Sequence, residues 1–256
     1  LMNKNILWHP SKSQIQNSQM MDFINYINHL YNLNFNTYDE LYAWSITNFI
    51  DFWNSFKNYS KIKFSNEPIE VIDDSSKMLG AKWFNGGRLN YAENLLQFKN
   101  NNIALRFFGE DRVFRELTYI ELQNEVKKVQ KYFISLGIKE GDKIAGYIPN
   151  MPETIICMLA ATSLGAIWSS CSPDFGVVGV LDRFEQIQPK ILIVADGYYY
   201  KGKSINYSDK VNKVINGLKD LEKIIEVPYI DEINKYNCSF TKYSNIELNN
   251  NHNLTF

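Results

Sequence analysis

"AIWSSCSPDFGVVGVLDRFEQIQPKILIVAD", residues 166–196, contains two short apolar runs on either side of a segment with helical spacing. AIWSSCS and KILIVAD have the length and composition of buried strands, and Val177 to Ile187 between them has the spacing of a helix. A strand, a helix and a strand in this order predict two parallel strands joined by a right-handed crossover. The stretch therefore predicts an α/β fold.

The same alternation continues on both sides of this unit. KIAGYIP at residues 143–149 and KIIEVPYI at residues 223–230 read as strands, while the segments at about Pro152 to Leu164 and Ser208 to Leu221 read as helices. Strands that alternate with helices predict a mostly parallel sheet with helices on its faces. Because ligands of such sheets usually bind beyond the carboxyl ends of the strands, the loops that follow these strands are the first candidates for a site.

A hairpin and a further helix are predicted just before this alternation. IALRFF, residues 103–108, and VFREL, residues 113–117, flank the turn GEDR, and Thr118 is placed to cap the following helix. The turn carries Glu110 and Asp111, which we interpret as solvated loop charges.

The first hundred residues differ from the rest, because they are rich in Asn and aromatic residues and show helical periodicity with little strand signal. We therefore predict a helix-rich leader over residues 1–100, followed by part of a sheet domain over residues 101–256. A capping box of Thr37 and Glu40 predicts one helix through residue 56. Four side chains would form its apolar core face: Leu41, Trp44, Phe52 and Phe56.

The leader is predicted to end in an irregular strap, KMLGAKWFNGGRLNYAENLL, residues 77–96. Its adjacent glycines interrupt any regular element. The aromatic side chains of Trp83, Phe84 and Tyr91 are expected to be its buried anchors.

Bulk properties exclude several classes of protein. A formal net charge of −1 provides no overall field for nucleic acid or an anionic membrane. No N-terminal signal pattern is present, and no apolar run approaches the roughly 20 residues of a membrane span. The three cysteines are odd in number and form no CxxC pair, so we expect no disulfide framework, no metal site and a cytoplasmic location. They are Cys157, Cys171, which we expect to be buried and inert, and Cys238.

One segment, GYYYKGKS at residues 197–204, matches the written pattern of a nucleotide-binding P-loop. It follows a strand, as a P-loop should, but three tyrosines fill the loop and the next helix is expected to begin only near Ser208. A true P-loop places small residues and a helix N-terminus round the phosphates. The ATPase interpretation is therefore disfavoured, and a solvated turn is the alternative.

Three stretches together resemble the acyl-CoA synthetases that form an acyl-adenylate, and most closely their acetoacetate-activating branch. They are WFNGGRLNYAENLL at residues 83–96, the segment from Tyr147 to Lys203, and the helix-rich leader. Within the second stretch, WSSCSPDFG followed by VLDRFEQIQPK favours the acetoacetate branch, since the acetyl branch typically has His at the Trp168 position. The resemblance implies the mostly parallel β/α domain of the adenylate-forming enzymes.

The activity that this resemblance implies has two steps and belongs to lipid and ketone-body metabolism. Acetoacetate attacks the α-phosphate of MgATP to give acetoacetyl-AMP and pyrophosphate, and the thiol of coenzyme A then displaces AMP. ATP, Mg²⁺ and coenzyme A are thus the implied substrates and cofactors, with acetoacetate as the acid. The implied partners are these small molecules, neither nucleic acid nor membrane, and the oligomeric state stays open.

The family's catalytic motifs are a Ser/Thr/Gly-rich loop that ends in Lys, a Mg-binding Glu, a ribose-binding Asp and a lysine in a mobile C-terminal domain. None of these motifs occurs before Phe256, and the polar, Asn-rich last stretch looks cut just before the phosphate loop. We therefore expect these 256 residues to carry no catalytic residues and to be inactive by themselves.

The resemblance also implies a contact with the phosphates of coenzyme A. In relatives an Arg-rich turn makes it, and the matching residues here are Tyr200, Lys201, Gly202 and Lys203. Lys203, with Lys201 as a second candidate, would replace arginine as the cation. An ammonium binds phosphate as a point charge without the bidentate fork of arginine, so we expect a weaker and less directional contact.

A second segment is implied to line the entrance for coenzyme A: Ser172, Pro173 and Asp174. An acidic side chain is an awkward neighbour for a polyanion. Asp174 could instead cap a helix that starts at Phe175, and both roles stay open.

Two other readings stay open beside this one. The chain could be a fragment of an acetyl-CoA or other short-chain acyl-CoA synthetase. It could also be a truncated, non-catalytic module that binds coenzyme A alone or another protein.

Overall fold

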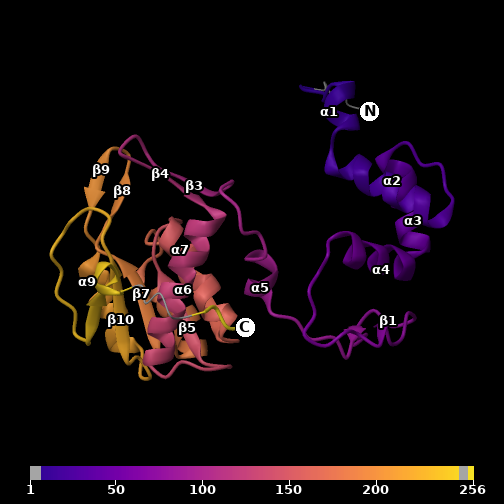
Figure 1. The fold of residues 1–256 in the computed structure, drawn as a ribbon. Helices are drawn as coiled ribbons and strands as arrows, with labels where there is room; N and C mark the ends of the chain where they lie inside the picture. The colour runs from indigo at the N-terminus through magenta and orange to yellow at the C-terminus, as the bar shows by residue number, and fades with distance from the viewer. Residues whose placement is uncertain (1–6, 248–252) are drawn as a thin grey trace, which may run out of the picture. The chain divides into compact units, whose positions relative to one another are not determined.

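The computed structural model describes residues 7–247 and 253–256, which form two compact units divided between Leu89 and Asn90 (Figure 1). The first is mainly helical, and the second contains a parallel sheet. A helix-rich N-terminal region followed by a mostly parallel β/α sheet was the predicted fold class, and it is confirmed.

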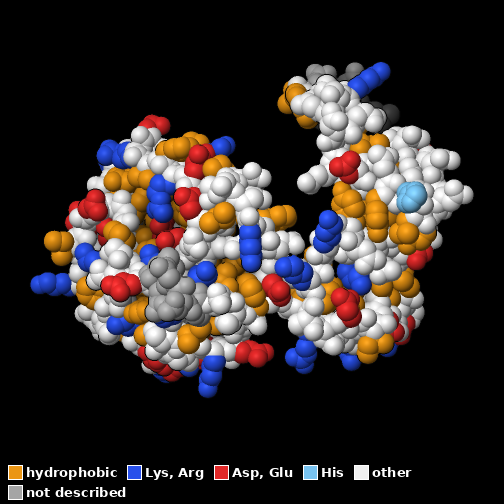
Figure 2. Space-filling model, viewed as in Figure 1, with side chains coloured by type: hydrophobic (Ala, Val, Ile, Leu, Met, Phe, Trp, Pro, Cys, Tyr) orange, Lys and Arg blue, Asp and Glu red, His pale blue; other side chains and the backbone are white. Residues whose placement is uncertain are grey.

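The described part of the first unit, residues 7–89, contains four helices and one small antiparallel sheet. They are α1 (Lys12–Gln16), α2 (Gln19–Tyr31), α3 (Tyr38–Thr47), α4 (Phe49–Tyr59), β1 (Glu70–Ile72) and β2 (Trp83–Asn85). Ile24 and Ile27 of α2 are fully buried and pack with Leu41 of α3. Other apolar side chains reach the surface of this unit, as Figure 2 shows.

The single helix predicted from Thr37 is wrong in one respect, because the structure has two helices there. The capping box of Thr37 and Glu40 starts α3 as predicted. At Asn48 the backbone leaves helical geometry (φ −120°, ψ 44°), and the Asn48 side chain donates to the carbonyl oxygen of Trp44 at 3.2 Å. An asparagine side chain that binds nearby backbone competes with the helix in this way. Phe56, on the second helix, is consequently 41% exposed.

The prediction that Trp83 and Tyr91 are buried anchors of the strap is wrong. Trp83 lies on β2 and is 45% exposed, while Tyr91 begins α5 (Tyr91–Leu95) and is 53% exposed. Trp83 contacts the ring of Phe49, with centroids 5.9 Å apart, but this contact covers only part of the indole. Residues expected in an irregular strap thus belong to two short regular elements.

The second unit begins with α5, the antiparallel hairpin of β3 (Ile103–Gly109) and β4 (Val113–Thr118), and α6 (Tyr119–Ser135). Five parallel strands follow: β5 (Lys143–Tyr147), β6 (Ile167–Cys171), β7 (Ile191–Ala195), β10 (Lys223–Val227) and β11 (Phe240–Lys242), before the short 3₁₀ helix Tyr243–Asn245. The connecting helices are α7 (Pro152–Ser163), α8 (Val177–Ile187) and α9 (Ser208–Gly217). The hairpin, the capped helix and all four predicted sheet strands are confirmed.

Strand order in the sheet is β11-β10-β7-β5-β6, so the chain reverses its direction across the sheet after β6. Right-handed crossovers in opposite directions place α7 and α8 on opposite faces. α6 packs beside α7 (Figure 1), and α8 packs beside α9. The reversal brings the loops after β6 and β7 to the two sides of the carboxyl end of β5, where ligands of such sheets bind.

Helix α9 ends four residues before the predicted Leu221. Gly217 lies so close to α8 that an added Cβ would be 2.6 Å from the Leu181 side chain, and the backbone turns to an extended conformation at Leu218. Helix α9 thus ends at the residue where it packs closely against α8.

Gly197, directly after β7, is required by packing. An added Cβ would overlap the side chain of Ile230 and lie 2.8 Å from the carbonyl oxygen of Ile205. Gly197 fits the written P-loop pattern, but the close packing of Ile230 and Ile205 around it explains the glycine.

We expect Gly197→Ala to lower the free energy of unfolding by about 1–3 kcal/mol, because overpacking forces side chains and backbone to shift. Gly176→Ala is the matched control, since its added Cβ would meet nothing within 4 Å and its φ is −70°. It should change the free energy of unfolding by less than about 0.5 kcal/mol. Urea unfolding followed by circular dichroism measures both, and equal effects would contradict the packing role.

Candidate functional site

The turn that carries the four candidates Tyr200 to Lys203 joins two short strands. β8 (Tyr198–Tyr200) and β9 (Lys203–Ile205) pair antiparallel, and Tyr200 faces Lys203 at the end of the ladder. Lys201 and Gly202 both have positive φ, at 51° and 73°. Two consecutive positive φ values are typical of the tight two-residue hairpin turn, which favours glycine. The segment therefore has no P-loop geometry.

The three tyrosines of this hairpin divide between packing and solvent. Tyr198 packs edge-on against Tyr207, with ring centroids 5.7 Å apart, and Tyr199 packs against Tyr229 at 5.1 Å. Tyr200 is 48% exposed, and the Lys201 ammonium lies 5.3 Å from its ring centroid. Lys203 is also exposed. The turn thus presents two ammonium groups to solvent from a base of packed aromatic rings.

Ser172, Pro173 and Asp174 form the loop after β6. The Ser172 hydroxyl donates to Asp174 Oδ2 at 3.2 Å and accepts from the backbone N–H of Asp174 at 3.3 Å. Pro173 is buried and Asp174 is exposed. The following helix begins at Val177 with Gly176 as its N-cap and has no side-chain cap. The alternative role of Asp174 as a helix cap is therefore wrong.

Two tyrosines bring this loop and the hairpin together. The hydroxyl of Tyr147, the last residue of β5, donates to the carbonyl oxygen of Phe175 at 2.8 Å. The Asp174 carboxylate lies close enough to the hydroxyl of Tyr198 to affect its pKa. Burial raises the pKa of Tyr147 to about 12, and burial and Asp174 raise the pKa of Tyr198. Both hydroxyls therefore stay protonated donors near neutral pH.

A third tyrosine, Tyr207, supports this arrangement from within the core. Its hydroxyl accepts the N–H of Ala195 at 2.9 Å and donates to the carbonyl oxygen of Tyr147 at 2.7 Å. Burial raises its pKa well above the usual value. Sequence reasoning missed both residues. Tyr147 carried a signal, because a buried tyrosine at the end of an apolar strand needs a polar partner, whereas Tyr207, just before α9, carried none.

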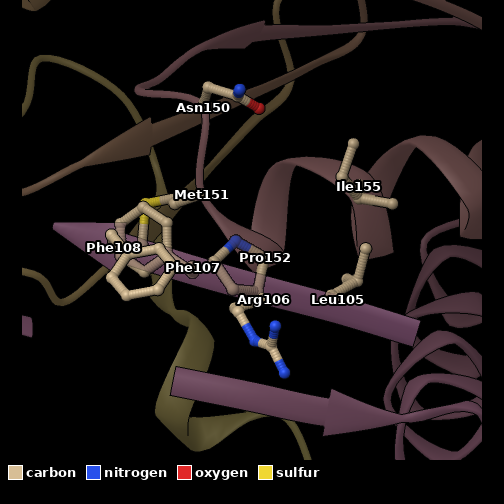
Figure 3. A pocket seen from close by; sticks show the side chains of 8 residues that line it. All are labelled: Leu105, Arg106, Phe107, Phe108, Asn150, Met151, Pro152 and Ile155. Carbon is tan, nitrogen blue, oxygen red and sulfur yellow. The ribbon is translucent and has the colours of Figure 1, made fainter. Parts of the chain in front are cut away.

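A separate pocket lies between β3 and the start of α7 (Figure 3). Phe107, Phe108 and Met151 gather at one end of it, and Ile155 lies at the other. The guanidinium of Arg106 points toward β4, where it pairs with Glu116. Polar and apolar surface line the pocket in similar amounts, and no candidate site residue lines it.

Within residues 7–247 and 253–256, no group of three or more His, Cys, Asp or Glu side chains could hold a metal ion. In the same ranges, no helix is long and apolar enough to cross a membrane.

The cysteine at the end of β6 behaves as an inert core residue. Cys171 is 5% exposed, as predicted, and Cys157 is fully buried in α7. Burial raises the pKa of both thiols. Since the thiolate is the nucleophile, neither thiol is suited to nucleophilic catalysis.

We expect iodoacetamide at pH 8 to label Cys238, which is half-buried, well before Cys157 or Cys171. Peptide mass spectrometry of the native protein measures the order. Labelling of Cys171 first would contradict its assignment as a buried thiol, and labelling in urea should make the three rates similar.

Comparisons with known proteins agree with this geometry. The family described as "AMP-binding enzyme" matches residues 92–250, and the family "Acetyl-coenzyme A synthetase N-terminus" matches residues 38–95. Acetoacetyl-CoA synthetase of Macaca fascicularis is 40% identical over 238 residues, which is 91% of this chain and 35% of the relative. The acetoacetyl-coenzyme A synthetase of Rhizobium meliloti is 43% identical over 212 residues, which is 83% of this chain and 32% of the relative.

A solved structure gives the same relationship in three dimensions. The acetoacetyl-CoA synthetase from Streptomyces lividans superposes with a TM-score of 0.88 at 29% identity, covering 98% of this chain and 39% of that one. The chain therefore spans about a third of the length of the curated relatives that it matches.

Proposed function

This chain belongs to the AMP-binding enzyme family, and we propose that it is the N-terminal part of an ATP-dependent acetoacetate-CoA ligase. The whole protein would convert acetoacetate, ATP and coenzyme A to acetoacetyl-CoA, AMP and pyrophosphate, with acetoacetyl-AMP as the intermediate. One observation carries this proposal: about 40% identity with acetoacetyl-CoA synthetases along nine-tenths of the chain. We assign no catalytic residue to these 256 residues, which we expect to be inactive by themselves.

In this proposal residues 1–100 are the leader and strap, and residues 101–256 are the first part of the adenylating domain. The enzyme would act in the cytoplasm, in ketone-body and lipid metabolism. Mg²⁺ would enter as the companion of ATP. Coenzyme A is the ligand that we assign to this part of the protein.

The proposed contact with coenzyme A lies at the turn Tyr200, Lys201, Gly202 and Lys203, with Ser172, Pro173 and Asp174 beside its entrance. Lys201 and Lys203 are exposed and positively charged, as a phosphate contact requires. The hydroxyl of Ser172 donates to the carboxylate of Asp174, which is exposed beside this entrance.

A specific observation favours a second candidate function. Residues 38–95 match the N-terminal family named after acetyl-coenzyme A synthetase, so an acetyl-CoA or other short-chain acyl-CoA synthetase is the alternative. The two candidates differ in the acid that is activated and share the proposed contact with coenzyme A.

The activity is tested by assaying the protein that contains these residues with MgATP, coenzyme A and either acetoacetate or acetate. We expect acyl-CoA and AMP to form with a kcat/KM for acetoacetate at least about tenfold above that for acetate, which corresponds to 1.4 kcal/mol of discrimination. Preference for acetate would support the second candidate. Absence of acyl-CoA with either acid would contradict both.

The proposed contact predicts that Lys203→Ala raises the KM for coenzyme A about tenfold and leaves the KM for ATP unchanged. A hydrogen bond to a charged group contributes about 1.5 kcal/mol, and 1.4 kcal/mol is a factor of ten. Lys139→Ala is the matched control, because Lys139 is an exposed lysine before β5, at the opposite edge of the sheet. Equal changes in the two KM values for Lys203→Ala would contradict the assignment.

A further inference from the structure

Two turns that are about ninety residues apart in the sequence meet at the proposed coenzyme A contact. The backbone N–H of Lys201 donates to Glu110 Oε1 at 2.7 Å, and that of Gly202 donates to Glu110 Oε2 at 2.9 Å. Each carboxylate oxygen of Glu110 thus accepts one amide of the turn. Glu110 is exposed in its turn, as predicted, but the prediction of a solvated loop charge missed these two hydrogen bonds.

The same hairpin tip also binds the carbonyl side of the turn. Arg112 Nη2 donates to the carbonyl oxygen of Gly202 at 2.8 Å, and the guanidinium lies 5.2 Å from the ring centroid of Tyr199. The tip between β3 and β4 therefore contacts both amide and carbonyl groups of the turn as well as an aromatic ring beneath it.

The tip is itself held in place by the rest of the domain. An added Cβ at Gly109 would overlap the hydroxyl of Tyr229, and the ring of Phe107 packs against Tyr229 with centroids 6.0 Å apart. The backbone N–H of Tyr229 donates to Asp196 Oδ1 at 2.7 Å, and Asp196 is 1% exposed. Glu110 thus connects the turn to a loop that is fixed by a buried carboxylate.

The turn needs such an external contact. Its two strands have three residues each, and an isolated two-stranded hairpin is marginally stable at best. Consecutive backbone N–H groups in a turn can also bind an anion by themselves. Because the Glu110 carboxylate already accepts both amides, a phosphate at this turn must be bound by the lysine side chains.

We propose that Glu110 is a positioning residue for coenzyme A, which holds the Lys201-Gly202 turn so that the ammonium of Lys203 meets a phosphate of the ligand. This inference rests on the proposed function. Glu110 and Arg112 together add no net charge to the turn. The repulsion between an exposed carboxylate and a phosphate is screened by water and salt, whereas the two hydrogen bonds act directly on the backbone. We therefore expect the two hydrogen bonds of Glu110 to favour binding of coenzyme A by more than its repulsion of the phosphate disfavours it.

The test is Glu110→Gln in the complete protein, with Asp111→Asn as the matched control. Glutamine keeps the length of the side chain, but its amide nitrogen cannot accept a hydrogen bond, so one of the two contacts is lost. Asp111 lies in the same tip, is exposed, and loses the same charge in its variant. The KM values are measured for coenzyme A, for ATP, and for pantetheine, which carries no phosphate.

We expect Glu110→Gln to raise the KM for coenzyme A about fivefold while the KM for ATP, the KM for pantetheine and kcat stay within twofold. Amide hydrogen exchange at Lys201 and Gly202 should become faster. Asp111→Asn should change none of these quantities. A general loss of folding would lower the apparent kcat and leave the three KM values unchanged, so a KM that rises for coenzyme A but not for pantetheine identifies a phosphate-specific role.

Lys203→Ala, measured beside these variants, separates the positioning role of Glu110 from the proposed contact between Lys203 and coenzyme A. If Lys203→Ala raises the KM for coenzyme A and Glu110→Gln leaves it unchanged or lowers it, the positioning role is overturned and the proposed contact stands. If neither variant changes that KM, both are overturned. Unchanged exchange at the two amides would also contradict the role of Glu110.

Discussion

The hydroxyl of Tyr207 connects the carboxyl ends of two neighbouring strands, and the candidate site depends on this connection. It accepts from Ala195 at the end of β7 and donates to Tyr147 at the end of β5. Tyr147 in turn holds the loop that follows β6. Because the strand order reverses across β5, this chain of hydrogen bonds joins the two loops where a ligand of such a sheet binds. The core of the domain thereby sets the spacing between Asp174 and the β8-β9 hairpin.

Aromatic packing and hydrogen bonds to charged side chains hold the β8-β9 hairpin. Its rings pack on Tyr207 and Tyr229, while its turn is bound by the carboxylate of Glu110 and the guanidinium of Arg112. These contacts leave the lysine side chains as the exposed charges of the turn. A site that replaces arginine with lysine loses the directionality of a bidentate guanidinium. A turn that is held in a fixed position compensates for this loss of directionality, since it limits the positions that the ammonium group of Lys203 can reach.

Local signals in the sequence predicted most of the domain, and interactions between distant residues account for much of what they missed. The four apolar strands, the α8 bounds and the capping boxes at Thr37 and Thr118 follow from periodicity and side-chain chemistry within a few residues. The exposure of Trp83 depends on packing that the pattern does not encode, whereas the break at Asn48 accompanies a local bond of its side chain to the carbonyl oxygen of Trp44. The contact of Glu110 with a turn some ninety residues away has no local signal, because an acidic residue in a hairpin turn usually faces water.

The most direct test of the central claim is a crystal structure of the protein that contains these residues, grown with coenzyme A. The account predicts a phosphate oxygen of coenzyme A within hydrogen-bond distance of Lys203 Nζ, with the carboxylate of Glu110 still accepting from Lys201 and Gly202. Coenzyme A bound elsewhere, or a phosphate that displaces Glu110 from the two amides, would contradict it.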